Sequence, residues 1–199
     1  VPVIACPCTV CASQDAKDKR LRSSVMIEDK GFTLVIDTGP DFRQQMLRTK
    51  VKKLDAVIFT HEHKDHIAGF DDIRAFNYVL RKKMDVYASV RVQEAIRKEF
   101  SYIFYEEKYP GVPEIDLYTI GTKEFTIGGI TIIPIQVLHH KMPVLGFRVG
   151  DFTYITDANY IPEEEKKKIL GSKVFVLNAL RKETPLSHFT FAQAIDLAA

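Results

Sequence analysis

The segment LDAVIFTHEHKDH, residues 54–66, decides the fold of this chain. Its first half, residues 54–60, is a mainly apolar run, which is typical of a buried central strand. Its second half packs three imidazoles and the carboxylate of Asp65 into six positions. Such groups are costly to bury unless they are paired or bind a metal. The alternative is a polar surface turn, but surface turns seldom follow a fully apolar strand, so the segment indicates a metal site.

The spacing within HEHKDH favours two metal ions rather than one. Residues two apart in an extended chain project to the same side, so His61 and His63 can bind one ion. The chain is then expected to turn into a helix, which would direct Asp65 and His66 towards a second ion nearby.

The remaining sequence predicts a mixed α/β fold. The predicted strands alternate with turn signals and form hairpins early and late in the chain, with helices between them and at the end. Strands are expected at residues 24–28, 32–37, 54–60, 84–88, 125–127, 130–138, 144–149, 152–156 and 173–177, and helices at 41–48, 67–80, 90–104, 162–170 and 190–199. Two sheets packed face to face with helices outside would give a four-layer αββα sandwich, here as a single domain over residues 1–199.

Composition excludes some classes of function without selecting one. The chain has 199 residues, of which 46% are hydrophobic and 27% charged, and its net charge is +2. This charge is too small to indicate a nucleic acid or an anionic membrane as partner. No run of 18 or more apolar residues exists, which excludes a membrane-spanning helix in this sequence. Composition thus gives the class of protein and nothing about its chemistry.

The cysteines form a second cluster. All three, Cys6, Cys8 and Cys11, lie in the motif CPCTVC. Neighbours this close would strain a disulfide, and three thiolates suit a structural tetrahedral zinc with one ligand from elsewhere. Buried reduced cysteines or a redox role are the alternatives. Cysteines used in this way fit a reducing, cytoplasmic compartment.

HEHKDH matches the HxHxDH signature of the metallo-β-lactamase superfamily, which the chain resembles from about Asp37 onwards. The resemblance implies that Asp37 buttresses the HEHKDH loop and that Asp157, in YITDANY, bridges two metals. A turn-forming aspartate is the alternative for Asp157. For the third histidine of the first metal site, the spacing to Gly146 favours His140 over His139. The implied ligands of the dinuclear site are His61, His63, Asp65, His66, His140 and Asp157.

The order CxCxxC before HxHxDH resembles the phosphoribosyl cyclic phosphate phosphodiesterase branch of that superfamily. Pyrroloquinoline quinone B-type relatives share the cysteine pattern. The branch resemblance implies a catalytic role for His188, whose alternative is a solvent-facing residue before a helix. Residues 178–180 (Asn-Ala-Leu) depart from the branch, which puts the substrate in doubt. The resemblance also implies an opening strand before Val1, and a fourth zinc ligand and a last active-site histidine beyond Ala199.

The function expected from these motifs is hydrolysis of a small cyclic phosphodiester by a hydroxide held between two zinc or manganese ions, with Asp65 and His188 as catalytic residues. A transfer-RNA 3′-end nuclease is an alternative, but no basic arm is present and Lys64 stands where that class usually has glycine. A thioester, lactone or lactam hydrolase and a non-catalytic zinc protein of a cofactor pathway are the others.

Two further features stay open on sequence alone. The aromatic residues Tyr102, Phe104, Tyr105 and Tyr109 surround an irregular loop at 105–116, which could be a lid, a self-association surface for a homodimer, or simple core packing. Arg43, Lys141 and Arg181 could each contact a phosphate, and the sequence does not single one out.

Overall fold

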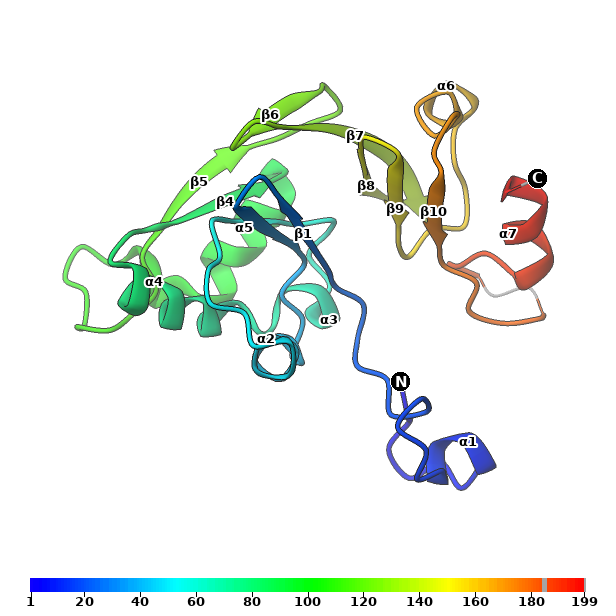
Figure 1. Cartoon of the computed structure of the whole chain (residues 1–199), viewed down its shortest axis with the longest axis horizontal. Coiled ribbons are helices and arrows are strands. Elements are labelled where there is room, and N and C mark those ends of the chain that lie inside the picture. Colours follow the sequence, from blue (N-terminus) through cyan, green and yellow to red (C-terminus); the bar gives the residue numbers. More distant parts are fainter. Residues whose placement is uncertain (184–185, 199) are drawn as a thin grey trace.

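A computed structural model describes residues 1–183 and 186–198 and contains two five-stranded sheets (Figure 1). The first has the order β1-β2-β3-β4-β5 and consists of β1 (Val25–Asp29), β2 (Phe32–Ile36), β3 (Ala56–Ile58), β4 (Met84–Ala88) and β5 (Ile115–Thr119). The second has the order β10-β9-β8-β7-β6 and consists of β6 (Phe125–Ile127), β7 (Ile130–His139), β8 (Met142–Val149), β9 (Phe152–Ile155) and β10 (Val174–Leu177).

The helical elements connect the strands. They are α1 (Thr9–Ala12), α2 (Phe42–Thr49), α3 (Lys64–Ile67), the 3-10 turn η1 (Phe70–Ile73), α4 (Arg74–Leu80), α5 (Val90–Glu99), the 3-10 turn η2 (Ser101–Phe104), α6 (Glu163–Lys166) and α7 (Phe191–Ala198). Strands β2 to β5 pair in parallel, because a crossover segment separates each pair, and β9 and β10 pair in parallel across α6. The β1–β2 pair and the β6 to β9 ladder are antiparallel.

Three apolar layers hold the domain together. Alternate residues of a strand face opposite sides, so Leu34 and Ile36 of β2 point to the second sheet while Val35 points to the helices. The layer between the sheets joins Leu34 and Ile36 to residues such as Phe147 of β8. A third layer covers the other face of the second sheet, where Val137 packs in the same cluster as residues of α7. Three apolar layers define four structural layers, which confirms the expected αββα sandwich.

The helix predicted at residues 67–80 is divided into α3, η1 and α4, and the reason is a close backbone contact. A Cβ placed on Gly69 would lie 2.1 Å from the carbonyl oxygen of Gly39. A Cβ placed on Gly39 would lie 2.1 Å from the carbonyl oxygen of Asp65. The chain therefore bends at Gly69 to pack its backbone against the segment that follows β2, which fixes the position of the HEHKDH loop.

Other boundaries also differ from expectation. The loop predicted at residues 105–116 ends at β5, which sequence patterning missed. The helix predicted at residues 90–104 breaks at Phe100 into α5 and η2. A capping box begins α7, because Gln193 N donates to Thr190 Oγ1 and Thr190 N donates to Gln193 Oε1.

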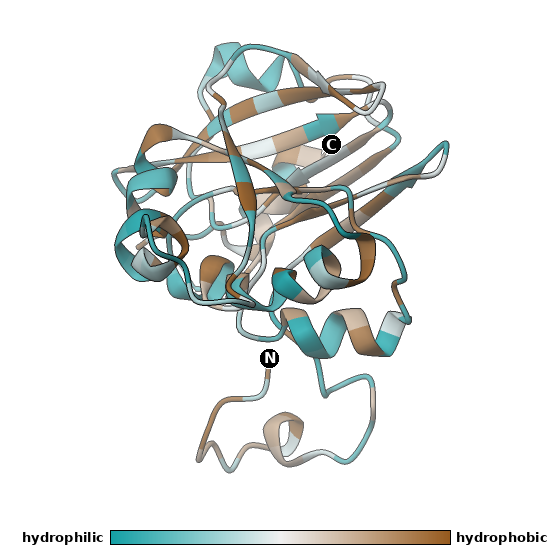
Figure 2. Cartoon of the chain, turned by 90° about the vertical axis from the view of Figure 1, so that its left-hand side faces the viewer, coloured by the Kyte–Doolittle hydropathy of each residue, from teal (hydrophilic) through white to brown (hydrophobic). Residues whose placement is uncertain are grey.

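Helix α1 lies apart from the two sheets in both views, whereas the strands bring hydrophobic residues together in the interior (Figures 1 and 2). The end of the N-terminal segment rejoins the body of the domain, where Ser24 Oγ donates to the carbonyl oxygens of Ile36 and Asp37. None of the helices within residues 1–183 and 186–198 is long and apolar enough to cross a lipid bilayer.

Candidate metal centre

A cluster of imidazoles forms where strands from both sheets end. His61 and His63 follow β3, and His139 is the last residue of β7. The ring centroids of His61 and His63 are 4.7 Å apart, and those of His61 and His139 are 5.9 Å apart. His66, in α3, lies 4.1 Å from His61, and His188, between β10 and α7, lies 4.8 Å from His139. Residues separated by more than a hundred positions therefore meet at one edge of the sandwich.

Asp157, in the loop after β9, is the centre of this cluster. Its Oδ2 lies 3.1 Å from Nε2 of His66 and 3.5 Å from Nε2 of His61. Its Oδ1 lies 3.5 Å from Nε2 of His188. Three groups of potential ligands converge within 4.8 Å, and Asp157 belongs to all three: His61–His63–Asp157, Asp65–His66–Asp157 and His139–Asp157–His188. One carboxylate is thus placed to be shared between neighbouring cations.

The hydrogen bonds around His61 define its tautomer. Thr60 Oγ1 lies 2.8 Å from Asp37 Oδ2 and 2.9 Å from His61 Nδ1. The hydroxyl has one proton and donates it to the carboxylate, so it accepts a hydrogen bond from Nδ1–H of His61. The lone pair of His61 Nε2 therefore points into the cluster. This buried atom has no hydrogen-bond partner among the described residues.

His139 and His66 are held in the same orientation by outer acceptors. Nδ1 of His139 donates to the carbonyl oxygen of Ser187 at 2.7 Å, which leaves its Nε2 as the atom able to bind a metal. Nδ1 of His66 lies 2.7 Å from Asp37 Oδ2 and directs its Nε2 towards Asp157. Metal-binding histidines commonly donate their other N–H to a carboxylate or carbonyl in this way.

Asp37 supports the HEHKDH loop, as the resemblance implied. It is fully buried and has a positive φ of 64°, which turns the chain sharply after β2. Its Oδ1 accepts a hydrogen bond of 2.8 Å from Thr60 N, and its Oδ2 accepts from Thr60 Oγ1 and His66 Nδ1. The carboxylate thereby joins the end of β3 to α3.

Burial and neighbouring charges shift the pKa values of the clustered residues in different directions. Burial, and then the neighbouring His66, lowers the pKa of His61, so its imidazole is neutral and able to bind a cation. Burial alone would lower the pKa of His66, but hydrogen bonds to Asp157 and Asp37 raise it to about 10. Burial alone would raise the pKa of Asp157, but His66 and His61 hold it below its usual range. The carboxylates thus create a site that attracts positive charge.

The donor set fits divalent metal ions. It offers the imidazoles of five histidines around the carboxylate of Asp157, with the exposed carboxylate of Asp65 at its edge. Imidazole and carboxylate ligands suit zinc and manganese. The unpartnered Nε2 of His61 is the strongest single indication, because a buried imidazole nitrogen without a partner is costly unless it binds an ion.

The structure corrects the choice between His139 and His140. Strand β7 continues to His139, so this side chain faces the cluster. His140 is exposed, has a φ of 57° in the turn to β8, and is held there through its backbone N–H, which donates to Asn159 Oδ1 at 2.6 Å. The structure therefore brings His139, and not the expected His140, into the cluster. Spacing to Gly146 could not show at which residue the strand ends.

Sequence reasoning also missed residues that shape the loops of the centre. Besides Thr60, Asn178 donates to the carbonyl oxygen of Ala158 and accepts from its N–H, at 2.9 and 2.8 Å. Asn159 holds the turn at His140. Asn178 comes directly after β10, which is a recognisable signal for a loop-fixing contact, but the partners of both asparagines lie too far along the chain to identify from sequence.

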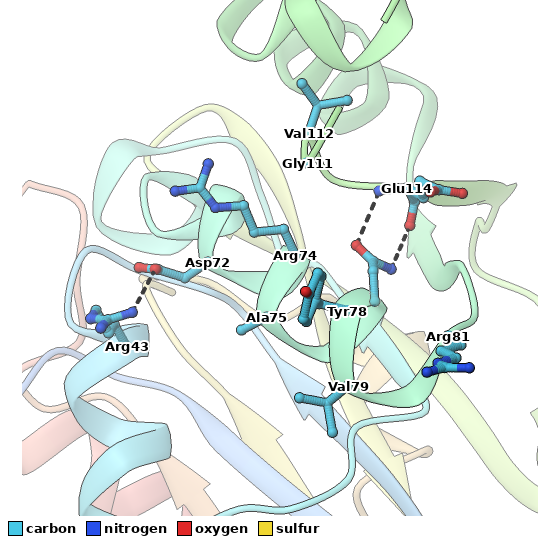
Figure 3. A pocket seen from close by; sticks show the side chains of 11 residues that line it. Arg43, Asp72, Arg74, Ala75, Tyr78, Val79, Arg81, Gly111, Val112 and Glu114 are labelled. Carbon is cyan, nitrogen blue, oxygen red and sulfur yellow. Dashed lines mark hydrogen bonds and ion pairs between the residues drawn. The ribbon is translucent and has the colours of Figure 1, made fainter. Parts of the chain in front are cut away.

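The cluster opens into a pocket of about 380 Å³. Its described lining comprises Val1, Arg22, Ser23, His63, Asp65, His66, His139, Asp157, Leu180 and His188. A larger cavity of about 800 Å³ lies elsewhere, between α4 and the loop at Gly111 (Figure 3). Arg43 and Arg74 line that cavity and are paired with Asp72 and Asp71. It contains none of the clustered histidines, so the smaller pocket is the candidate active site.

The aromatic residues that sequence left open divide into two groups. Tyr102 and Phe104 pack against the core beside α5, and Tyr102 OH donates to Asp71. Tyr105 and Tyr109 are exposed and do not line the candidate active site.

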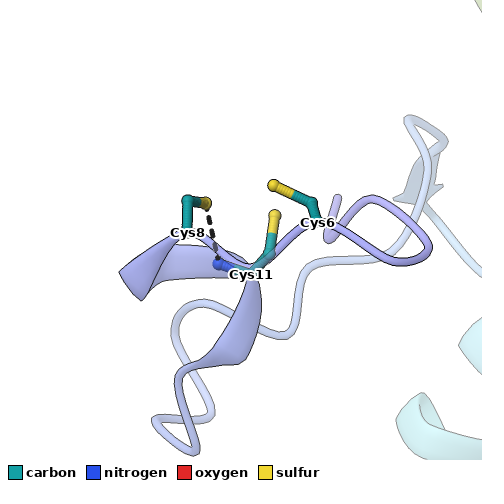
Figure 4. Close-up of side chains that lie close together, drawn as sticks. All are labelled: Cys6, Cys8 and Cys11. Atoms are coloured by element: carbon teal, nitrogen blue, oxygen red, sulfur yellow. Dashed lines mark hydrogen bonds between the residues drawn. The ribbon is translucent and has the colours of Figure 1, made fainter.

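The cysteines form a separate cluster at the start of α1, which contains Cys11 and has Cys8 as its N-cap residue (Figure 4). Sγ atoms of Cys6, Cys8 and Cys11 lie within 4.8 Å of one another, and all three are free thiols. The backbone N–H of Cys11, and then the neighbouring thiols, lower the pKa of Cys8 to about 7. A thiol that ionises near neutral pH, next to two others, fits a structural metal ion such as zinc.

Comparisons with known proteins agree with this geometry. Residues 33–199 match the family model described as a beta-lactamase superfamily domain. A diphosphatase of the PhnP family has a similar crystal structure, with a TM-score of 0.92 and 34% identity over 100% of this chain and 76% of that one. Zinc-bound PqqB from Methylobacterium extorquens shares the fold, with a TM-score of 0.70 and 19% identity over 92% of this chain and 70% of that one.

A curated relative is named octanoyltransferase and comes from Porphyromonas gingivalis (strain ATCC BAA-308 / W83). It is 39% identical over 200 residues, which is 98% of this chain. The chain spans only 40% of the length of that relative.

Proposed function

The chain belongs to the metallo-β-lactamase superfamily, and on that premise we propose that it hydrolyses a small phosphate ester, in the first place a cyclic phosphodiester. The observation that supports this most directly is the convergence of His61, His63, His66 and His139 on Asp157. A metal-dependent hydrolase needs this kind of donor set at the floor of an open pocket.

The clustered residues would hold two divalent cations. His61, His63 and His139 would surround the first, Asp65 and His66 the second, and Asp157 would lie between them. Such ions, zinc or manganese, polarise a phosphoryl oxygen and lower the pKa of water. The outer contacts from Asp37, Thr60 and Ser187 keep the imidazole rings fixed, so little reorganisation is needed when substrate binds.

Two residues at the mouth of the pocket would donate a proton and orient the attacking water. His188 Nε2 faces the cluster, 3.5 Å from Asp157 Oδ1, while its Nδ1 lies 3.1 Å from Ser187 Oγ. We assign His188 to protonate the leaving alkoxide at its oxygen. Asp65 is half exposed at the edge of the pocket and would orient the attacking water by accepting a hydrogen bond.

The choice of phosphorus over carbonyl chemistry rests on similarity. The diphosphatase of the PhnP family is 34% identical and superimposes over the whole chain. The pocket of about 380 Å³ suits a small substrate rather than an RNA duplex. An acyl thioester is the second candidate, because the relative named octanoyltransferase is 39% identical over this region.

The test is a substrate panel on purified protein loaded separately with zinc and with manganese. The panel contains bis(p-nitrophenyl) phosphate, adenosine 2′,3′-cyclic phosphate, octanoyl-coenzyme A and a chromogenic β-lactam. We expect turnover of the two phosphodiesters and loss of that turnover in Asp157→Ala. Turnover of octanoyl-coenzyme A alone would replace the phosphodiesterase proposal with a thioesterase.

A further inference from the structure

A groove runs over the helices on the outer side of the first sheet. The cavity of about 800 Å³ beside α4 shares Arg43, Asp72, Ala75 and Val79 with a cavity of about 310 Å³ between α2 and α4, so the two adjoin. It also shares part of the loop at residues 111–114 with a third cavity, of about 180 Å³. We call these three cavities the α2–α4 groove. Among the described residues, none that lines it also lines the pocket of the histidine cluster.

The floor of the α2–α4 groove is apolar. Phe42 and Phe76 are buried beneath it, with ring centroids 6.4 Å apart. At the surface of the groove, Leu47 is 62% exposed, Val79 is 70% exposed and Tyr78 is 87% exposed. Leu47 belongs to α2, whereas Tyr78 and Val79 belong to α4 (Figure 3). Exposed apolar side chains that gather around a hollow, unlike single scattered ones, mark an interaction site.

The rim of the groove is basic. Its described lining includes six basic and two acidic side chains, namely Arg43, Lys52, Arg74, Arg81, Lys83 and Lys108 against Asp72 and Glu114. Six positive and two negative charges give this lining a formal charge of +4, whereas the whole chain carries only +2. Three of the six cations are paired with carboxylates. The other three, Lys52, Arg81 and Lys108, are exposed and form no ion pair within residues 1–183 and 186–198.

The apolar floor and the basic rim together select one kind of occupant. A second copy of this chain, placed on the groove by two-fold symmetry, would bring the same positive rim against it. A nucleic acid would satisfy the rim, but its charged backbone has no apolar side chains to cover Leu47 and Val79. A lipid bilayer presents a broad surface that does not enter a recess between two helices. An amphipathic helix with acidic borders satisfies both floor and rim, because such helices lay an apolar face into a groove.

We propose that the α2–α4 groove binds an acidic amphipathic helix of a partner protein. Apolar side chains of that helix would cover Leu47 and Val79, and its carboxylates would pair with Lys52, Arg81 and Lys108. Burial of apolar surface would supply most of the affinity, and the opposite charges would speed association and select acidic partners. This site is separate from the candidate metal centre, so the proposal does not depend on the phosphoesterase function.

A designed peptide tests the proposal on the whole, metal-loaded chain. The peptide has about sixteen residues, with leucines on one helical face, glutamates along the borders of that face and alanines elsewhere. Two matched peptides carry lysine in place of every glutamate, or serine in place of every leucine. Fluorescence anisotropy should show saturable binding of the acidic peptide, and each matched peptide should bind at least about tenfold more weakly. Added salt should weaken the binding of the acidic peptide.

Two double variants locate the binding on the protein. Lys52→Glu/Arg81→Glu should weaken binding of the acidic peptide at least about tenfold, because it reverses two charges of the rim. Leu47→Ser/Val79→Ser should weaken it by a similar factor, because it removes apolar surface from the floor. All four side chains are exposed, so the fold should tolerate both variants, and their thermal unfolding should match that of wild type.

A matched control separates the groove from the net charge of the chain. Lys123→Glu/Lys167→Glu makes the same change in charge at exposed lysines outside the groove, and its affinity for the acidic peptide should stay within about twofold of wild type. An acidic peptide that does not bind, a lysine peptide that binds as well, or an equal loss in the control would overturn the proposal. Tighter binding of a single-stranded oligouridylate would assign the groove to nucleic acid instead. A dimer in sedimentation that Leu47→Ser/Val79→Ser dissociates would assign it to a second copy.

Discussion

The histidine cluster and the cysteine cluster are both candidate metal sites, but the chain builds them in different ways. The histidines are supplied by both sheets, and their rings are fixed by Asp37, Thr60 and the Ser187 carbonyl. The cysteines lie within six residues at the start of α1, a helix that has no buried residue and stands apart from the sheets. The fold therefore organises the first site in advance, whereas the second depends on the ion that binds it.

The largest effect on activity is expected from removing metal ligands of the histidine cluster. The double variant His61→Ala/His63→Ala should lose at least about a thousandfold in kcat/KM, because several kcal/mol of transition-state stabilisation come from the metals. Metal analysis should show loss from the histidine cluster and retention at the cysteines. The triple variant with Cys6, Cys8 and Cys11 changed to serine should lose the metal at the cysteines and keep the metals of the histidine cluster. A double variant that keeps both its activity and its full metal content would reject the catalytic assignment.

The next effect separates two adjacent histidines. His139→Ala should lose about a hundredfold or more in activity, since it removes a ligand, whereas His140→Ala should stay within about twofold. His140 is the matched control, because it lies in the same turn and is exposed. A larger loss in the His140 variant would show that the turn is misplaced and would restore the choice that sequence spacing favoured.

The dependence of the cysteine site on its ion can be tested by chelation. Without metal, only local contacts such as Cys11 N to Cys8 Sγ hold α1. Limited trypsin digestion after chelation should cleave within residues 1–24 at least about tenfold faster, while the sandwich core stays resistant. Cys8→Ser should be cleaved at the high rate before chelation. Equal rates with and without metal would mean that the segment is ordered without an ion.

The smallest effect concerns Asp55, a buried carboxylate away from both sites. Burial alone would raise the pKa of Asp55, but hydrogen bonds from Lys82, Thr33 N and Lys53 lower it. Its stabilisation is therefore present above the unfolded pKa of about 3.9 and is lost as pH falls through the lower folded pKa. Asp55→Asn should lower the free energy of unfolding by about 1 to 2 kcal/mol at pH 7.

The pH dependence supplies the control for that variant. In urea unfolding, the difference between wild type and Asp55→Asn should shrink as the pH falls below about 4, because the carboxyl group is then protonated in the unfolded wild type and, at still lower pH, in the folded wild type. A difference that is constant from pH 7 to pH 3 would assign the effect to packing instead of charge.

Features that depend on one short stretch of sequence were predicted. Features that depend on contacts between distant segments were not. HEHKDH after an apolar strand predicted the metal loop, and Asp37 and Asp157 lie where the resemblance placed them. His139 was missed because the end of β7 depends on its pairing with β8 across a turn. Arg22 was missed as a residue that lines the pocket, because Asp41, which holds it there, is 19 residues away. The break at Gly69 arises from contact with Gly39, which no periodicity shows.

That contact has a consequence for which substrates the pocket can accept. The backbones at Gly69, Gly39 and Asp65 stack directly, with no side chain between them to yield. The wall that carries Asp65 and His66 is therefore rigid and cannot widen for a bulkier molecule. Selectivity must be adjusted on the opposite wall, where Leu180 and His188 belong to a connection between β10 and α7. Changing Leu180 is therefore the most direct way to redesign the specificity of the pocket, because it leaves in place Ser187, which holds His139, and His188.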